Sequence, residues 1–220
     1  MAAGGYLKAA DLPQVIPVFP LDGVLLLPHG TLPLNIFEPR YLNMIDDAMA
    51  GDRIIGMIQT VGDDDPDRPQ IARIGCAGRI TSYAETPDGR YLITLTGVCR
   101  FAVAGELPVQ TPYRQVRADF GRFGQDLAGD EPEADHDRDG LLEALRDYLE
   151  RRGLAVDWRM AQEAPIEALV NSLSMALPFG PSAKQALLEA PHLAARRVAL
   201  VTLLRIEGMT GDDDAPPQMQ

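Results

Sequence analysis

The stretch "IARIGCAGRITSYAETPDGRYLITLTGVCRFAVAGEL", residues 71–107, carries the clearest structural signal in this sequence. Residues 71–85 and 91–104 are rich in apolar and β-branched side chains, and "TPDGR" separates them. An Asp-Gly pair between two such runs is a strong marker of a tight β-hairpin. By the strand period of two, one face of the first strand carries Ile74, Cys76, Gly78 and Ile80. The stretch therefore predicts a long hairpin within a curled sheet.

The residues before this hairpin predict more strands and one helix. Apolar runs at 14–21, on both sides of "PHGT" (28–31) and at 53–61 have the composition of strands. Pro39 suits the first position of a helix that ends at Ala50, because Gly51 suits the residue after a helix end. The buried stripe of this helix is expected to be Leu42, Ile45, Ala48 and Met49. Residues 112–123 predict a further strand.

The rest of the chain predicts helices. Apolar residues recur at helical spacing in residues 138–153, with Asp139 as N-cap, and then in three further segments, 164–178, 180–190 and 191–208. Strands followed by helices indicate the α+β class. We therefore predict four parts: a β-rich subdomain over residues 1–123, an acidic linker over 124–139, a helical bundle over 140–208 and a disordered tail over 209–220.

The composition restricts the classes of partner. The formal net charge is -12, and only two lysines occur, Lys8 and Lys184. Such a chain is poorly suited to binding nucleic-acid phosphates or an anionic membrane surface. No apolar run approaches the ~18 residues of a membrane span, and the first residues do not resemble a signal peptide, so we expect a cytoplasmic protein. There Cys76 and Cys99 are expected to be free and buried, with a disulfide as the less favoured alternative.

The motifs of common enzymes are missing from the sequence. It has no phosphate-binding loop, dinucleotide fingerprint, G-x-S-x-G or zinc-ligand spacing. Residues 180–183, "GPSA", resemble the serine-bearing segment of Lon-type Ser-Lys peptidases, but Lys184 follows Ser182 by only two residues and would point away from it on a helix. An acidic loop contains four aspartates: Asp63, Asp64, Asp65 and Asp67. It lacks the central glycine and the final glutamate that an EF-hand calcium loop needs. We expect no catalytic, cofactor or metal site.

The corner "LPLNIFEPRYLNM", residues 32–44, is the candidate partner-binding site. A strand pattern stops there and a helical pattern begins at once. Five residues form the corner: Phe37, Glu38, Pro39, Arg40 and Tyr41. In one interpretation they are only a helix start, with Phe37 and Tyr41 packed as a staple. In the other they form an exposed polar and aromatic edge that contacts a partner.

Three blocks, residues 16–59, 74–101 and 183–190, resemble the stand-alone Lon N-terminal-domain proteins of bacteria, which are also called Lon substrate-binding-domain or "peptidase S16, lon domain" proteins. The resemblance runs from Val15 to Ile206. It implies a PUA-like β pseudo-barrel with an inserted helix, followed by a small helical bundle. It also implies a role in recognising unfolded or tagged substrates, and no catalytic residue.

Three functional hypotheses remain. The first is a non-catalytic protein-binding module or adaptor that holds apolar segments in the groove between barrel and bundle. Its partners would be unfolded or client proteins and a separate Lon protease. The second is RNA binding, through a local patch among the arginines at 73, 79, 90, 100, 114, 117 and 122. The third is a cryptic hydrolase that uses Ser182 or Cys76.

Overall fold

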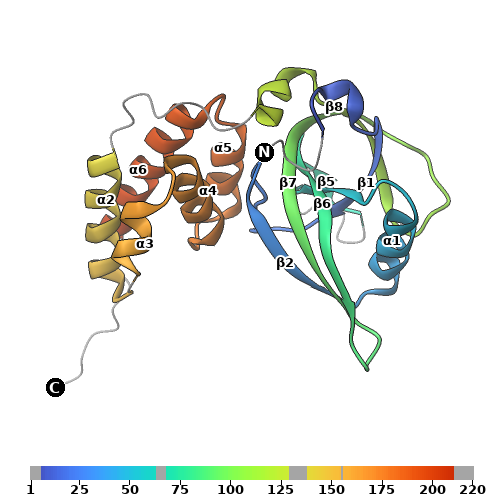
Figure 1. Ribbon diagram of the computed structural model, residues 1–220, viewed down its shortest axis with the longest axis horizontal. Helices are drawn as coiled ribbons and strands as arrows, with labels where there is room; N and C mark the ends of the chain where they lie inside the picture. The colour runs from blue at the N-terminus through green and yellow to red at the C-terminus, as the bar shows by residue number, and fades with distance from the viewer. Residues whose placement is uncertain (1–5, 63–67, 129–137, 155, 211–220) are drawn as a thin grey trace.

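The computed structural model describes residues 6–62, 68–128, 138–154 and 156–210. A barrel-like sheet lies beside a bundle of helices, with helix α1 on the side of the barrel that faces away from the bundle (Figure 1). This arrangement confirms the predicted α+β class, a β-barrel with an inserted helix followed by a helical bundle.

The barrel is built from six strands of one sheet in the order β2-β7-β6-β3-β1-β8. Their bounds are β1 Val15–Pro20, β2 Thr31–Ile36, β3 Ile54–Ile58, β6 Ile74–Glu85, β7 Tyr91–Glu106 and β8 Arg114–Asp119. A small second sheet pairs β4 (Thr60–Val61) with β5 (Gln70–Ile71). The sheet closes because β7 is long enough to pair with β2 along its first half and with β8 along its second half. Strand β2 consequently stays at an edge.

The helices are α1 Pro39–Ala50, α2 Arg138–Arg152, α3 Trp158–Glu163, α4 Ile166–Ala176, α5 Pro181–Glu189 and α6 Leu193–Thr210, with 3-10 turns η2 Ala9–Asp11 and η3 Gly121–Leu127. The predicted bounds of α1 are confirmed. Its stripe was partly wrong, because the buried residues are Tyr41, Met44, Ile45 and Ala48. Leu42 and Met49 are only half-buried. The buried stripe of α1 is therefore shifted by about one residue toward the N-terminus relative to the expected stripe.

Several other expectations were wrong in detail. The first apolar run beside "PHGT" forms no strand, although Leu25, Leu26 and Leu27 are all buried. The run at 53–61 is divided into β3 and β4, and the strand at 112–123 ends at Asp119, where η3 follows. Asp139 lies inside the first turn of α2 and is not its N-cap, and no helix was predicted where α3 lies.

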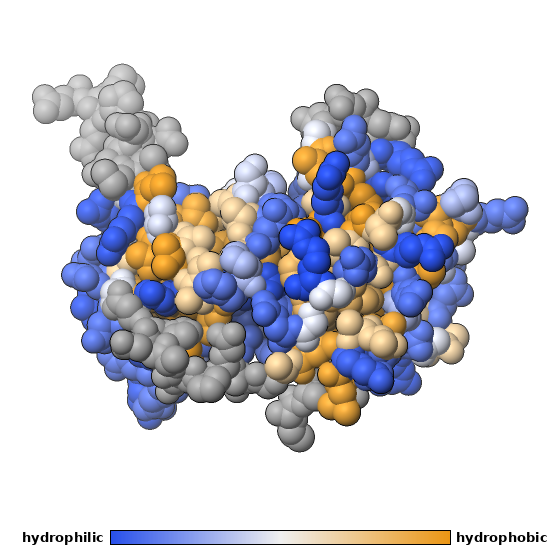
Figure 2. Space-filling view, turned by 90° about the horizontal axis from the view of Figure 1, so that it is seen from above, coloured by the Kyte–Doolittle hydropathy of each residue, from blue (hydrophilic) through white to orange (hydrophobic). Residues whose placement is uncertain are grey.

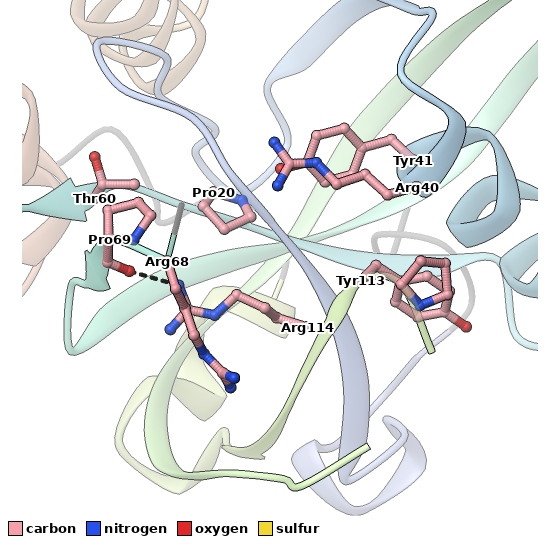
Figure 3. A pocket seen from close by; sticks show the side chains of 9 residues that line it. Pro20, Arg40, Tyr41, Thr60, Arg68, Pro69, Tyr113 and Arg114 are labelled. Carbon is pink, nitrogen blue, oxygen red and sulfur yellow. Dashed lines mark hydrogen bonds between the residues drawn. The ribbon is translucent and has the colours of Figure 1, made fainter. Parts of the chain in front are cut away.

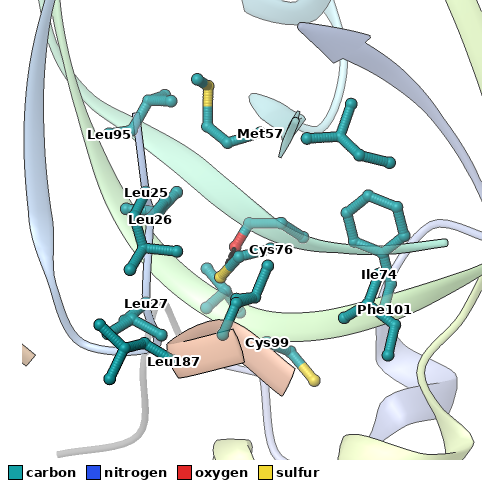
Figure 4. Close-up of a cluster of buried hydrophobic side chains, with 14 of the residues drawn as sticks. Leu25, Leu26, Leu27, Met57, Ile74, Cys76, Leu95, Cys99, Phe101 and Leu187 are labelled. Carbon is teal, nitrogen blue, oxygen red and sulfur yellow. Dashed lines mark hydrogen bonds between the residues drawn. The ribbon is translucent and has the colours of Figure 1, made fainter. Parts of the chain in front are cut away.

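One hydrophobic cluster extends through both parts of the chain. It contains barrel residues such as Leu27 and Cys76 together with bundle residues such as Leu187 of α5, and Figure 4 shows Leu187 beside the barrel's apolar side chains. Full burial of one such leucine is worth about 1.5–3 kcal/mol. Strand β6 is buried on both faces from Ile74 to Ala77: Gly75 faces Phe101 inside the barrel, and α5 packs against the strand, where Gln185 donates to Ile74 O.

The division into parts at residues 123 and 139 stays a prediction. Residues 124–127 of the expected linker belong to η3, and α2 begins at Arg138. Residues 129–137 lie outside the described part of the chain, as does most of the expected tail.

Candidate functional site

The predicted corner lies where β2 ends and α1 begins. Pro39 takes the first helical position, and Arg40 Nε donates a hydrogen bond of 2.9 Å to Glu38 Oε2. Phe37 is 63% exposed. Tyr41 is buried, with its ring centroid 4.2 Å from that of Phe19. The two aromatic rings therefore lie in different surroundings and share no buried staple.

A small pocket of about 120 Å³ opens beside the corner. Figure 3 shows Arg40 and Tyr41 of α1 on one wall, with Arg68 and Arg114 on another. Each arginine here is ion-paired, since Arg40 pairs with Glu38, while Arg68 and Arg114 share Glu106 at 2.6 and 2.7 Å, so that two carboxylates face three guanidinium groups. The hydrogen bond from Arg114, and then that from Arg68, holds the pKa of Glu106 below its usual value. The corner thus contributes Arg40 and Tyr41 to a pocket whose three arginines are all ion-paired.

Three of the seven arginines invoked for RNA binding are ion-paired in the same way. Arg90 pairs with Asp88 at 2.9 Å, and Arg100 is buried against Asp126 at 2.8 Å. Arg114 is held by Glu106. A groove that follows a nucleic-acid backbone needs cations that face the phosphates. These three arginines instead form ion pairs with acids of the same chain.

A larger groove of about 550 Å³ lies between the barrel and the bundle. Residues 29–33, at the start of β2, form one wall. Helix α4 and the residue before it form the other wall, with Pro165, Glu167, Ala168, Asn171, Ser172, Met175 and Ala176. In Figure 1, β2 is the barrel strand that runs along the side facing the bundle. The groove anticipated between barrel and bundle is therefore present.

The two walls of this groove are fixed to each other. Asn171 Nδ2 donates a hydrogen bond of 3.0 Å to the carbonyl oxygen of Pro28, and His29 Nδ1 lies 3.1 Å from Glu167 Oε1. Met175 packs closely against Gly30, where an added Cβ would lie 2.5 Å from its sulfur and the methionine side chain would have to shift. His29 itself has a φ of 62°, which is uncommon for a residue with a side chain. The groove is consequently preformed.

A buried polar junction supports the groove from behind. Arg196 Nη1 donates to Asn171 Oδ1 at 3.1 Å and its Nε donates to Leu187 O at 2.9 Å. Burial, and then the nearby Arg100, lowers the pKa of Arg196 to about 10. Arg100 and Arg196 were not recognised as junction residues from the sequence. The one available signal was Arg100 within the apolar run "GVCRF".

The residues considered for catalysis are not assembled into a site. Ser182 is exposed at the start of α5, whereas the buried Lys184 donates a hydrogen bond of 3.0 Å from its amine to the carbonyl oxygen of Met175. Cys76 and Cys99 are free and buried. Burial raises the pKa of the Cys99 thiol to about 12 and that of Cys76 well above its ordinary value. Neither thiol is poised as a nucleophile at neutral pH.

The surface gives two further findings. On the face shown in Figure 2, apolar side chains form separate patches between polar ones. None of the helices in the described ranges is long and apolar enough to cross a membrane. Asp63, Asp64, Asp65 and Asp67 lie outside the described residues.

Comparison with known proteins gives relatives of one kind. Lon protease 2 of Myxococcus xanthus is 31% identical over 121 residues, which cover 54% of this chain and 14% of the relative. Lon protease of Flavobacterium johnsoniae is 24% identical over 211 residues, which cover 90% of this chain and 24% of the relative. The chain therefore spans less than a quarter of the length of these two relatives.

Two solved structures share the fold. The Lon N-terminal domain protein from Xanthomonas campestris superposes with a TM-score of 0.61 at 24% identity, covering 86% of this chain and 97% of that one. The N-terminal domain of Mycobacterium avium complex Lon protease gives 0.61 at 16% identity, with 87% and 98% covered. The family model described as the ATP-dependent protease La (LON) substrate-binding domain matches residues 15–205, and this chain belongs to that family.

Proposed function

We propose that this chain is a non-catalytic protein-binding module that holds segments of unfolded or client polypeptides in the groove between residues 29–33 and α4. The observation that carries the proposal is the preformed groove, whose volume of about 550 Å³ lies in the range typical of ligand sites. Its walls are joined by the Asn171 to Pro28 hydrogen bond and by the approach of Met175 to Gly30. A site that needs no reordering loses less free energy when a ligand binds.

Membership of a substrate-binding family supports this role, since the matched region is described by its binding of substrates. The binding needs no chemical step, and Ser182 and Lys184 form no dyad. We propose the cytoplasm as its place of action, because reducing conditions there keep cysteines such as Cys76 and Cys99 as free thiols.

The module would act as an adaptor if it also contacted a second protein, such as a separate Lon protease. We propose the corner Phe37 to Tyr41 as that second contact. Its support is the 63% exposure of the Phe37 ring, over which the guanidinium of Arg90 lies 5.9 Å from the centroid. Exposed aromatic and arginine side chains are the types enriched at protein interfaces.

The groove is tested with an unfolded model client. Reduced lysozyme alkylated with iodoacetamide, an unfolded and basic client, is labelled with a fluorophore and titrated with the protein, and the dissociation constant is read from anisotropy. Ala168→Arg places a long charged side chain on the exposed face of α4 inside the groove. We expect at least tenfold weaker binding.

Ala186→Arg is the matched control, because Ala186 is exposed on α5 and does not line the groove. We expect it to bind like the wild type. Equal binding by Ala168→Arg and the wild type would contradict the groove as the binding site.

A further inference from the structure

Strand β2 has an open side. In the sheet order it pairs with β7 alone, and no other described strand covers its second edge. An unpaired strand edge presents a row of backbone donors and acceptors to any extended chain that lies beside it. The residues at the start of this strand also line the groove.

The register shows which backbone groups face that open side. In an antiparallel ladder, successive residues direct their N–H and C=O groups to alternate sides. Gly97 N donates to Gly30 O at 2.8 Å, and Thr31 pairs with Thr96. It follows that Thr31, Pro33 and Asn35 direct their backbone groups away from β7. Pro33 fits this position, because proline is tolerated in strands where its missing N–H faces an edge.

The opposite wall leaves room for a chain. Ala168, Ser172 and Ala176 are spaced four residues apart on α4, so they lie one above another on one helix face. All three are small and exposed. An extended segment beside β2 would therefore meet few protruding side chains across the groove. Met175, half-buried against Gly30, supplies an apolar floor.

The charge of the groove restricts what it accepts. Among the described residues that line it there is no lysine or arginine, and Glu167, with a side-chain exposure of 19%, contributes a carboxylate that also pairs with His29 Nδ1 at 3.1 Å. The whole chain carries a net charge of -12. An acidic segment is disfavoured here, whereas a lysine or arginine beside Glu167 gains electrostatic attraction.

We propose that the client segment binds as an added β-strand along the open edge of β2, and that the groove selects extended apolar segments that carry a lysine or arginine and few acids. This inference rests on the proposed function and adds its binding mode and its sequence preference. Strand addition suits an unfolded client, because backbone hydrogen bonds supply affinity whatever the sequence.

Two other occupants fit less well. The chain's own residues 209–220 contain three consecutive aspartates, Asp212, Asp213 and Asp214. A second copy that bound about a two-fold axis would place the same acidic groove against itself. Both arrangements bring like charges together.

The test uses four fluorescent ten-residue peptides. The first alternates valine and threonine and carries one arginine. The second has glutamate in place of that arginine, and the third has glutamine there. The fourth keeps the arginine but is N-methylated at alternate amides, which removes the donors that a strand needs. We expect the first peptide to bind at least tenfold more tightly than the second and the fourth, with the glutamine peptide between them.

Two further measurements locate the peptide. Hydrogen exchange followed by NMR is expected to show slower exchange of the Thr31 and Asn35 amides when the first peptide is bound. Glu167→Gln, whose amide oxygen can still accept from His29, is expected to weaken binding of the arginine peptide at least threefold more than binding of the glutamine peptide. Glu150→Gln, at an exposed position of α2, is the matched control and should change neither.

The outcomes separate the inference from the proposed function. If the N-methylated peptide binds as well as its parent while Ala168→Arg still blocks binding, strand addition is wrong and the groove stands. If Ala168→Arg blocks none of the peptides, both are wrong. Slow exchange of Thr31 and Asn35 without peptide, with a dimer in light scattering, would assign the edge to a second copy and overturn the inference.

Discussion

At the scale of single residues, Arg100 joins three segments that are distant in the sequence. Its Nε and Nη2 donate to the Asp126 carboxylate at 2.9 and 2.8 Å, and its Nη1 donates to the carbonyls of Leu188 and Ala190 at the end of α5. The side chain is only 2% exposed. A buried arginine with every donor direction occupied costs desolvation, but its loss leaves the buried Asp126 carboxylate with no countercharge and only the Arg100 backbone N–H as a donor, and removes the guanidinium from the helix-end carbonyls.

We therefore expect Arg100→Met to lower the free energy of unfolding by about 3–5 kcal/mol, the range for breaking a buried ion pair on one side. Urea denaturation followed by circular dichroism measures this. Arg90→Met is the matched control, because Arg90 and Asp88 are about half exposed and such pairs contribute at most about 1 kcal/mol. Similar losses in the two variants would show that the junction is not stabilised by Arg100.

At the scale of elements, β7 depends on one glycine and not on another. A Cβ on Gly97 would lie 2.0 Å from the carbonyl oxygen of Leu27, which is backbone and cannot rotate away. A Cβ on Gly105, in the same strand, would meet nothing within 4 Å. The close approach at Gly97 lets the buried Leu25 to Leu27 segment cross the strand, which in turn positions residues 28–30 in the groove wall.

Gly97→Ala is expected to destabilise the protein by about 3 kcal/mol, at the upper end for overpacking, because the backbone must move. Gly105→Ala should stay within about 0.5 kcal/mol of the wild type, as expected for a surface change without a steric conflict. Thermal unfolding of both variants gives the comparison. A Gly97→Ala protein as stable as Gly105→Ala would mean that Leu27 can withdraw freely.

The sequence predicts those elements whose signals are local. The β6–β7 hairpin follows from Asp88-Gly89, and α1 follows from Pro39 and Gly51, which lie at its ends. Helix α3 was missed because six residues hold too little periodicity, although Asp157 is a usable cap signal whose side chain accepts from Met160 N. The residues 25–27 were misread because a buried extended run has the same composition as a strand.

The groove illustrates what local patterns cannot predict. Its position between barrel and bundle follows from the order of the elements and from the family resemblance. Its residues do not, because Asn171 and Pro28 are 143 positions apart and only the folded chain brings them together. The corner was easier to find, since a strand-to-helix change at Pro39 is visible in the sequence, but its role depends on contacts that no pattern encodes.

At the scale of the whole molecule, barrel and bundle share one hydrophobic cluster, and the hydrogen bonds from Arg100 to Leu188 O and from Asn171 to Pro28 O cross the same boundary. Parts joined in this way should unfold together. The groove then keeps its shape as long as the molecule is folded, because neither wall can loosen without the other. This coupling can be measured, because the chain carries a separate probe in each part.

The sequence has a single tryptophan, Trp158, which lies in α3 of the bundle, while Cys76 and Cys99 lie in barrel strands β6 and β7. We expect Trp158 fluorescence and thiol labelling at pH 8 to give the same urea midpoint. Burial holds both thiol pKa values above the ordinary one, so labelling requires unfolding, after which a pKa of ~8.5 allows rapid reaction. Two midpoints in the wild type would contradict a single cooperative unit. In Arg100→Met we expect both midpoints to move to lower urea together, because the shared hydrophobic cluster still joins the two parts.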